Sequence, residues 1–113
     1  MIDLHLHSRA SDGALTPTEL VALAASRDVK MLALTDHDCT DGLAEAARAA
    51  ADHSIQFSPG VEISVSWQNQ TLHIVGLDIN PDAADLQQGL AQLQALRDSR
   101  AQEIGRRLAK RGI

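Results

Sequence analysis

Apolar and polar residues alternate strictly over positions 2–7. Successive side chains of a β-strand point to opposite faces, so this pattern predicts a strand with one apolar and one polar face. Residues 8–13 include two serines, an aspartate and a glycine, and they indicate a loop directly after the strand. The apolar face comprises Ile2, Leu4 and Leu6, and the polar face comprises Asp3, His5 and His7.

Helical and extended patterns follow each other along the rest of the chain. The segment Thr16-Pro17-Thr18-Glu19 fits a capping box with proline at the first helical position, which predicts a helix ending near Arg27. Residues 31–35 are typical of a strand buried on both faces, as in parallel sheets. This order predicts the α/β class, either as a parallel sheet or as part of an α/β barrel. The other predicted elements are a helix over 43–53, a loosely alternating extended segment over 55–67 that includes Pro59-Gly60, a return strand over 71–79 after a turn at 68–70, and a long helix from Asp82.

Composition agrees with one small domain of helices packed on a sheet. With 44% apolar residues but only Trp67 and Phe57 aromatic, alanine and leucine are expected to fill the core. No run approaches the roughly 20 apolar residues of a membrane helix, and no signal-peptide pattern is found. The single cysteine, Cys39, cannot form an internal disulfide, which agrees with a reducing compartment. We therefore expect a soluble cytoplasmic protein, with no membrane association and no protein partner.

Charge is distributed unevenly along the chain. Residues 1–96 hold four basic and thirteen acidic residues, a balance of −9, whereas residues 97–113 hold six basic and two acidic, a balance of +4. The acidic part would repel a polyanion unless bound divalent cations reversed its local field. A nucleic-acid or phosphate partner is therefore not excluded by the net charge of −5.

Imidazole and carboxylate groups recur at or near the predicted strand ends. Each one alone has an ordinary structural explanation, as an exposed edge residue, a hairpin partner or a turn residue, but their common placement favours a metal site. Nitrogen and carboxylate ligands together suit Zn, Mn or Fe, and their number favours two or three ions over one tetrahedral ion. The candidate ligands are His5, His7, Asp12, His37, Glu62 and His73.

Four other ionisable residues are expected to have supporting roles. His53 lies at the end of a predicted helix among polar residues, so we expect it to be a C-terminal cap. Ligating histidines usually donate their second N–H to a carboxylate or carbonyl group. Asp3, Asp36 and Asp38 are therefore expected to orient such histidines or to fix the loops.

Five segments lie in a distinctive order: Asp3-Leu4-His5-Leu6-His7-Ser8, Ser11-Asp12-Gly13, Thr35-Asp36-His37-Asp38, Pro59-Gly60-Val61-Glu62-Ile63-Ser64, and His73. Together they resemble, at compatible spacing, the N-terminal motifs of the PHP (polymerase and histidinol phosphatase) family of metal-dependent phosphoesterases. The resemblance implies a distorted seven-stranded, TIM-like α/β barrel that holds three metal ions. It implies that the ligands are shared as follows: His5 and His7 on one ion, Asp12 and His37 on another, Glu62 bridging, and His73 on the remaining ion.

Within this family the chain is most similar to small bacterial members that act on nucleoside 3',5'-bisphosphates and on RNA 5' ends. A metal-activated water is the nucleophile that this implies. The family's last ligands come from strands beyond residue 113, so residues 1–81 are expected to be the N-terminal part of the barrel and residues 82–113 the start of a helical insertion. The 113-residue chain by itself is accordingly expected to be inactive and marginally stable.

Three alternatives to a nucleotide phosphoesterase share some of these features. An amidohydrolase also opens with His-x-His, but it is not expected to carry Asp12 or the segment Asp36-His37-Asp38. A non-catalytic metal-binding module, like the PHP modules of replicative DNA polymerases, often loses ligands, whereas all six are present here. Histidinol phosphate is a further alternative substrate, because metal motifs alone do not distinguish phosphate esters.

The long C-terminal helix carries two arginines within its apolar face. With Leu86 at 0°, Arg97 falls at about 20° and Arg100 at about 320°. Either the helix rolls or bends so that both side chains reach water, or both hold a substrate phosphate across the metal cleft through forked hydrogen bonds. Interruptions are expected at Gly89 or Gly105. The stripe expected to be buried comprises Leu86, Leu90, Leu93, Ile104 and Leu108.

Overall fold

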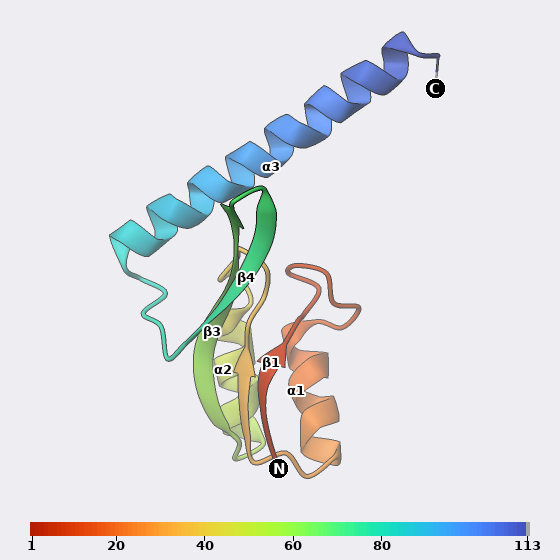
Figure 1. Cartoon of the computed structure of the whole chain (residues 1–113). Coiled ribbons are helices and arrows are strands. Elements are labelled where there is room, and N and C mark those ends of the chain that lie inside the picture. Colours follow the sequence, from red (N-terminus) through yellow and green to blue (C-terminus); the bar gives the residue numbers. More distant parts are fainter. Residues whose placement is uncertain (113) are drawn as a thin grey trace.

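The computed structural model describes residues 1–112, in which a sheet with two short helices is crossed by one long helix (Figure 1). Ile113, the last residue of the expected helical insertion, lies outside the described residues. The elements are β1 (Ile2–Leu6), α1 (Pro17–Ser26), β2 (Met31–Leu34), α2 (Leu43–Asp52), β3 (Gln56–Trp67), β4 (Gln70–Leu77) and α3 (Ala84–Lys110).

The two short helices begin and end where the sequence predicts. Thr16 Oγ1 accepts the backbone N–H of Glu19, and the Glu19 carboxylate accepts the backbone N–H of Thr16, which completes the capping box. The backbone hydrogen bond from Thr16, with a smaller contribution from its side chain, lowers the pKa of the Glu19 carboxyl. At the end of α2, the backbone N–H of His53 bonds to the carbonyls of Ala49 and Ala50, which confirms the predicted C-terminal cap.

The four strands form one curled sheet in the order β1-β2-β3-β4, so the α/β class is confirmed. β1, β2 and the first part of β3 are parallel, and β3 and β4 are antiparallel. β3 agrees with the extended segment predicted over 55–67, and it continues through Pro59 because its first part pairs with β2 and the rest with β4. Gly60 permits this close passage, since a Cβ there would lie 2.8 Å from the carbonyl oxygen of Gly76.

The hairpin between β3 and β4 brings two site residues to one face. Gln68 and Asn69 form the predicted turn, and their φ angles of 48° and 64° suit a type I′ hairpin. The register pairs Ser64 directly with His73. Glu62, two positions before Ser64 on β3, therefore shares a face with His73.

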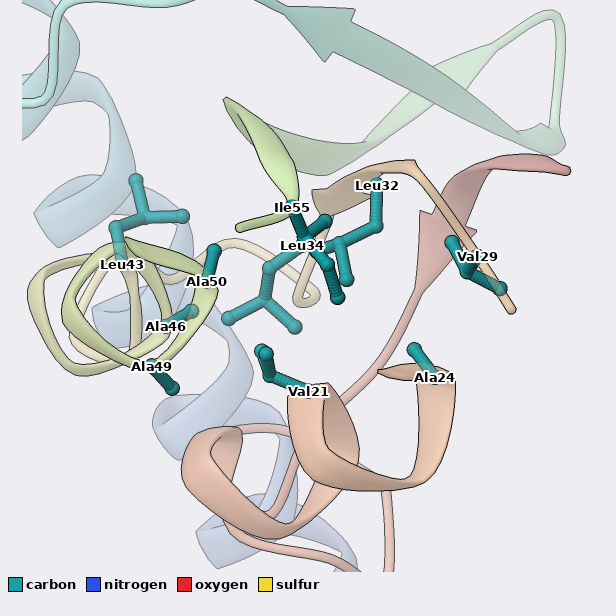
Figure 2. Close-up of a cluster of buried hydrophobic side chains, with 10 residues drawn as sticks. All are labelled: Val21, Ala24, Val29, Leu32, Leu34, Leu43, Ala46, Ala49, Ala50 and Ile55. Carbon is teal, nitrogen blue, oxygen red and sulfur yellow. The ribbon is translucent and has the colours of Figure 1, made fainter. Parts of the chain in front are cut away.

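A small aliphatic core lies between the sheet and the two short helices (Figure 2). Side chains of α1 and α2 meet Leu32 and Leu34 of β2, and Phe57 is only partly buried against them. The expectation that alanine and leucine fill the core is thereby confirmed, with valine and isoleucine as further contributors. The cluster comprises Val21, Ala24, Val29, Leu32, Leu34, Leu43, Ala46, Ala49, Ala50 and Ile55.

α3 is unbroken through Gly89 and Gly105, so the expected interruption is wrong. Its predicted buried stripe is confirmed in the first half of the helix and wrong in the second: Leu90 is 3% exposed and Leu86 and Leu93 are partly buried, but Ile104 is 57% and Leu108 41% exposed. The reason is that the second half of α3 extends past the sheet and the hairpin (Figure 1). Among residues 1–112, no helix combines the length and apolar character needed to cross a membrane.

Candidate metal centre

All six predicted ligands converge at the carboxyl ends of β1 and β2 and on the adjoining face of the hairpin. His5 lies in β1, and His7 follows immediately after this strand. His37 follows β2 and forms an isolated parallel bridge with Glu62 of β3. Because neighbouring parallel strands end at the same edge, ligands far apart in the sequence meet there.

Glu62 lies at the centre of the cluster and is only 4% exposed. Its Oε2 lies 2.7 Å from His37 Nδ1 and 3.8 Å from His73 Nδ1. Its Oε1 contacts His5 Nε2 and lies 3.9 Å from His7 Nε2. The two oxygens thus face different pairs of histidines, as a carboxylate bridging two ions must.

Asp12 forms the outer side of the cluster. Its Oδ2 lies 3.1 Å from His37 Nε2, and its Oδ1 lies 3.4 Å from His7 Nδ1. The rings of His7 and His37 stack with their centroids 4.4 Å apart. Asp12 and His37 also line a cavity of about 570 Å³, so the cluster is accessible from this side.

Three overlapping groups of ligand atoms are formed, and within each group all atoms lie within 4.8 Å of one another. They are His5-His7-Glu62, His7-Asp12-His37 and His37-Glu62-His73. A neutral imidazole offers one lone-pair nitrogen, so each histidine can serve one ion. The first and third groups share only Glu62, whose two oxygens can serve two ions. Five of the six residues can therefore complete the first and third groups at the same time. The sixth, Asp12, lies beside His7 of the first group and His37 of the third.

The donor set fits a divalent cation. His7 Nδ1 is buried without a hydrogen-bond partner among residues 1–112, although the Asp12 carboxylate lies within ion-pair distance. A buried nitrogen in this state is costly. If Nε2 of His7 binds an ion beside Glu62, Nδ1 carries the proton and faces the Asp12 carboxylate, which orients the ring as ligating histidines require. Mixed imidazole and carboxylate ligands are those that Zn, Mn and Fe take.

Asp36, only 1% exposed, fixes the first loop against the end of β2. Its Oδ1 accepts the Ser8 backbone N–H at 2.5 Å and the Ser11 hydroxyl at 2.8 Å. Its Oδ2 accepts the Ser8 hydroxyl at 2.6 Å. The loop carries Asp12, and His37 directly follows Asp36 in the chain. The Asp36 carboxylate therefore sets the distance between the candidate ligands Asp12 and His37. The loop-fixing role predicted for Asp36 agrees with these contacts.

Asp38 connects the same region to the hairpin and to α3. It is 1% exposed, and its Oδ1 accepts the backbone N–H of Ser64 at 2.9 Å. Its Oδ2 pairs with Arg97, and its backbone carbonyl accepts Gln94 Nε2 at 2.7 Å. Within the described part of the chain, Asp3 by contrast accepts only a local backbone N–H, that of His5, at 3.3 Å.

The sequence did not predict the pair between Asp38 and Arg97, because the helical wheel follows apolar residues only. Polar residues of α3 could have indicated this contact. Four residues through which α3 contacts the rest of the fold are spaced three, four and three apart, as one helix face requires. They are Gln87, Leu90, Gln94 and Arg97.

The structure places the two predicted arginines in different surroundings. Arg97 lines the cavity beside Asp12 and His37, with its guanidinium on Asp38. Arg100 lies about one helical turn further and lines cavities next to the hairpin. Their role toward a substrate phosphate stays a prediction.

Cys39 is buried beside the site. Burial raises the pKa of its thiol, and the backbone N–H of Asp41 lies 3.4 Å from its sulfur. The thiol is therefore protonated at neutral pH.

Two curated bacterial proteins are similar to almost the whole chain. A 3',5'-nucleoside bisphosphate phosphatase of Chromobacterium violaceum is 57% identical over 112 residues, which cover 99% of the chain and 39% of that protein. A 5'-3' exoribonuclease of Haemophilus influenzae is 48% identical over 111 residues, covering 98% of the chain and 40% of that protein. The chain thus spans about two fifths of the length of these relatives.

Solved structures give the same fold. A Chromobacterium violaceum protein described as an amidohydrolase, with bound sulfate and no metal, matches with a TM-score of 0.91 and 57% identity over 99% of the chain and 39% of its own. A Bifidobacterium adolescentis protein described as a metal-dependent phosphoesterase matches with a TM-score of 0.88 and 28% identity over 96% of the chain and 38% of its own. The model of the PHP domain family matches residues 3–107. Because this match spans nearly the whole length, the chain belongs to the PHP domain family.

Proposed function

We propose that the complete protein is a metal-dependent phosphoesterase that hydrolyses phosphate esters of nucleotides, either 3',5'-nucleoside bisphosphates or RNA from its 5' end. The observation that carries this proposal is the gathering of six imidazole and carboxylate ligands around Glu62 in one accessible cluster. The names of the two curated relatives support the substrate class. Asp12 and His37, which belong to motifs not expected in an amidohydrolase, take part in the cluster and favour phosphoester chemistry.

The candidate ligands form two groups that share Glu62. His5, His7 and Glu62 would hold one divalent ion, and His37 and His73 would hold a second with the other Glu62 oxygen. When bound, such ions supply an activated water and neutralise phosphate charge. The protein positions these ligands through buried anchors, above all Asp36, and keeps one side of the cluster open to substrate.

We also propose that Arg97 and Arg100 bind substrate phosphate. Arg97 supports this role best, because it lines the cavity beside Asp12 and His37. Asp38 holds the guanidinium in place, and a planar guanidinium fixed on one side can still present N–H groups on the other. Arg100 would meet a phosphate about one helical turn further along α3.

The finer features of the complete protein are also proposals. We propose three ions per chain, drawn from Mn, Zn and Fe, with the ligands beyond these six supplied by residues outside this chain. We propose a seven-stranded barrel, of which residues 1–81 form the N-terminal part, and a helical insertion that begins with residues 82–113. A cytoplasmic location agrees with the free thiol of Cys39 and with a nucleotide substrate.

The test uses the complete protein, stripped of metal and reconstituted with Mn²⁺. Phosphate release from adenosine 3',5'-bisphosphate and nucleotide release from 5'-phosphorylated RNA are measured together with metal content. We expect at least two ions per chain and hydrolysis of at least one of these substrates. Fewer than two ions would contradict the multi-metal centre, and no hydrolysis of either substrate would contradict the proposed function.

A matched pair of histidine variants separates the metal centre from general damage. His73→Ala removes a candidate ligand, whereas His53→Ala removes an exposed histidine at the end of α2. We expect His73→Ala to lose metal and activity, and His53→Ala to retain the metal content of the parent. Equal metal content in both variants would remove His73 from the ligand set.

A further inference from the structure

Three cavities follow one another from the metal centre along α3 toward the hairpin turn, and the middle one is lined largely by apolar residues of β3 and α3. The cavity of about 570 Å³ beside His37 is lined by Arg97. The next, of about 360 Å³, shares Arg97 and adds Arg100. A third, of about 610 Å³, shares Arg100 and reaches Gln68 and Asn69 at the hairpin turn. Consecutive cavities share a lining residue and therefore adjoin, and we call this row of cavities from the metal centre to the turn the hairpin groove.

The hairpin lines this groove with hydroxyl and amide residues and with Val65. Ser66 pairs with Thr71 across the hairpin, as Ser64 pairs with His73, so both pairs share the face of Glu62. Beyond them the groove is lined by amide side chains of the turn. Hydroxyl and amide groups can donate hydrogen bonds to phosphate and sugar oxygens without repelling them.

The helix side carries a stripe of arginines. With Leu86 at 0°, the stripe spans about 300° to 20°, whereas Arg106 falls at about 200° on another face. Over the 14 positions from its first to its last member, the stripe extends roughly 20 Å. One member, Arg107, also pairs with Glu103 at 3.1 Å, and it is largely exposed. The arginine stripe comprises Arg97, Arg100, Arg107 and Arg111.

We propose that the hairpin groove and the arginine stripe bind a single strand of nucleic acid that continues from the nucleotide held at the metal centre. This inference rests on the proposed function and adds to it the surface along which an RNA substrate lies beyond the metal centre. The occupant follows from charge, since residues 97–113 carry a balance of +4 and the remainder −9. It also follows from continuity, because the groove begins at the cavity lined by Asp12 and His37. An acidic peptide would match the charge but would have no reason to begin at a phosphoesterase centre.

The test measures binding separately from hydrolysis. A 3'-fluorescein-labelled RNA octamer with hydrolysis-resistant phosphorothioate linkages is titrated with the complete protein over a range of salt concentrations, and its anisotropy is followed. The variants are the double substitution Arg100→Gln/Arg107→Gln and the control Arg106→Gln, which removes the same charge from another face. A DNA octamer of the same sequence and an RNA duplex of the same length are further arms.

We expect the double variant to bind the octamer at least about tenfold more weakly, from two lost charge-assisted contacts. Its slope of log affinity against log salt should fall by about 1.4, at roughly 0.7 for each phosphate contact of a single strand. Arg106→Gln should behave like the parent. A stronger effect of the variants on RNA than on DNA identifies ribose contacts, and equal effects identify the phosphates alone; both support the proposal.

Three results would overturn the inference. Equal weakening by Arg106→Gln would mean that net charge and not the stripe governs binding. Parent-like binding by the double variant would remove the stripe from the path of the strand. Duplex binding as tight as single-strand binding, through the same arginines, would exclude a single-strand groove. The expected binding pattern without hydrolysis of any phosphoester would contradict the proposed function but support single-strand binding in the groove. Hydrolysis of mononucleotides without this binding pattern would contradict single-strand binding in the groove but not the proposed function.

Discussion

Replacing the buried carboxylate of Asp36 by the amide of asparagine tests how the metal centre is assembled. The carboxylate accepts three hydrogen bonds, two from Ser8 and one from Ser11. The change conserves shape, but it removes the charge and turns one of the two accepting oxygens into an amide group that donates. A hydrogen bond to a charged group contributes about 1 kcal/mol more than a neutral one, so three such bonds correspond to about 3 kcal/mol. Removing a buried charge also removes its desolvation cost, which brings the expected loss to about 2 kcal/mol.

The assay is urea unfolding of the complete protein, followed by circular dichroism with EDTA present so that metal binding does not contribute. Asp41→Asn is the matched control, because Asp41 lies five positions away and is exposed. We expect Asp36→Asn to lose about 2 kcal/mol and Asp41→Asn less than about 0.5 kcal/mol. A second readout is the Mn²⁺ affinity of the folded variant, which should fall because the loop that carries Asp12 is no longer fixed relative to His37.

The reasoning about Asp36 fails if the two asparagine variants unfold at the same urea concentration. A loss of stability with unchanged metal affinity would also be informative. It would mean that Asp36 stabilises the fold without setting the spacing of Asp12 and His37, which contradicts the positioning role.

Two further predictions concern local structure. Glu19→Gln should destabilise the protein at pH 7 but not in acid. Thr16 lowers the pKa of Glu19 below its usual 4.5, so the stabilisation is lost as the pH falls through the lowered value. Urea unfolding at pH 7 and at pH 3 checks this, and an equal difference in unfolding free energy at both pH values would contradict it. Gly13→Ala should weaken Mn²⁺ binding by about tenfold or more, because its Cβ would collide with the His7 carbonyl oxygen and lie 2.8 Å from the Ser8 carbonyl carbon; calorimetric titration measures this, and parent-like affinity would mean that the loop can shift without moving Asp12.

The convergence of the ligands could be predicted because it depends on local patterns and one topological rule. His5 and His37 each lie at or just after the end of a predicted strand, and parallel strands place their ends together. Which donor atoms face each other could not be predicted in this way. The opposite orientation of the two Glu62 oxygens depends on the registers of β3 with β2 and with β4, and register is a property of the assembled sheet.

The middle of β3 shows a second feature that the sequence alone does not explain. Pro59 and Gly60 together are ordinarily a signal for a turn, although they lie inside the extended segment predicted over 55–67. In the structure both residues lie within β3, at the point where its pairing passes from the parallel neighbour to the antiparallel one. Thr35 and Gly76 approach Gly60 so closely from both sides that only glycine fits. A glycine selected for close packing and one selected for a turn are identical in sequence, and only the neighbouring strands distinguish them.

The orientation of α3 depends in the same way on the surface that it meets. A helical wheel assumes that apolar residues mark the buried face, but the loop after β2 presents a threonine hydroxyl, a backbone carbonyl and the Asp38 carboxylate to the helix. Hydrogen-bonding side chains suit such a surface, so Gln87, Gln94 and Arg97 contact it while Ile104 stays exposed. Arg97, inside the predicted apolar stripe, therefore has a buried partner in Asp38 although its own side chain is half exposed. It places a cation where α3, the Asp38 carboxylate and the cavity beside His37 meet, and this is the position from which a substrate phosphate could be held.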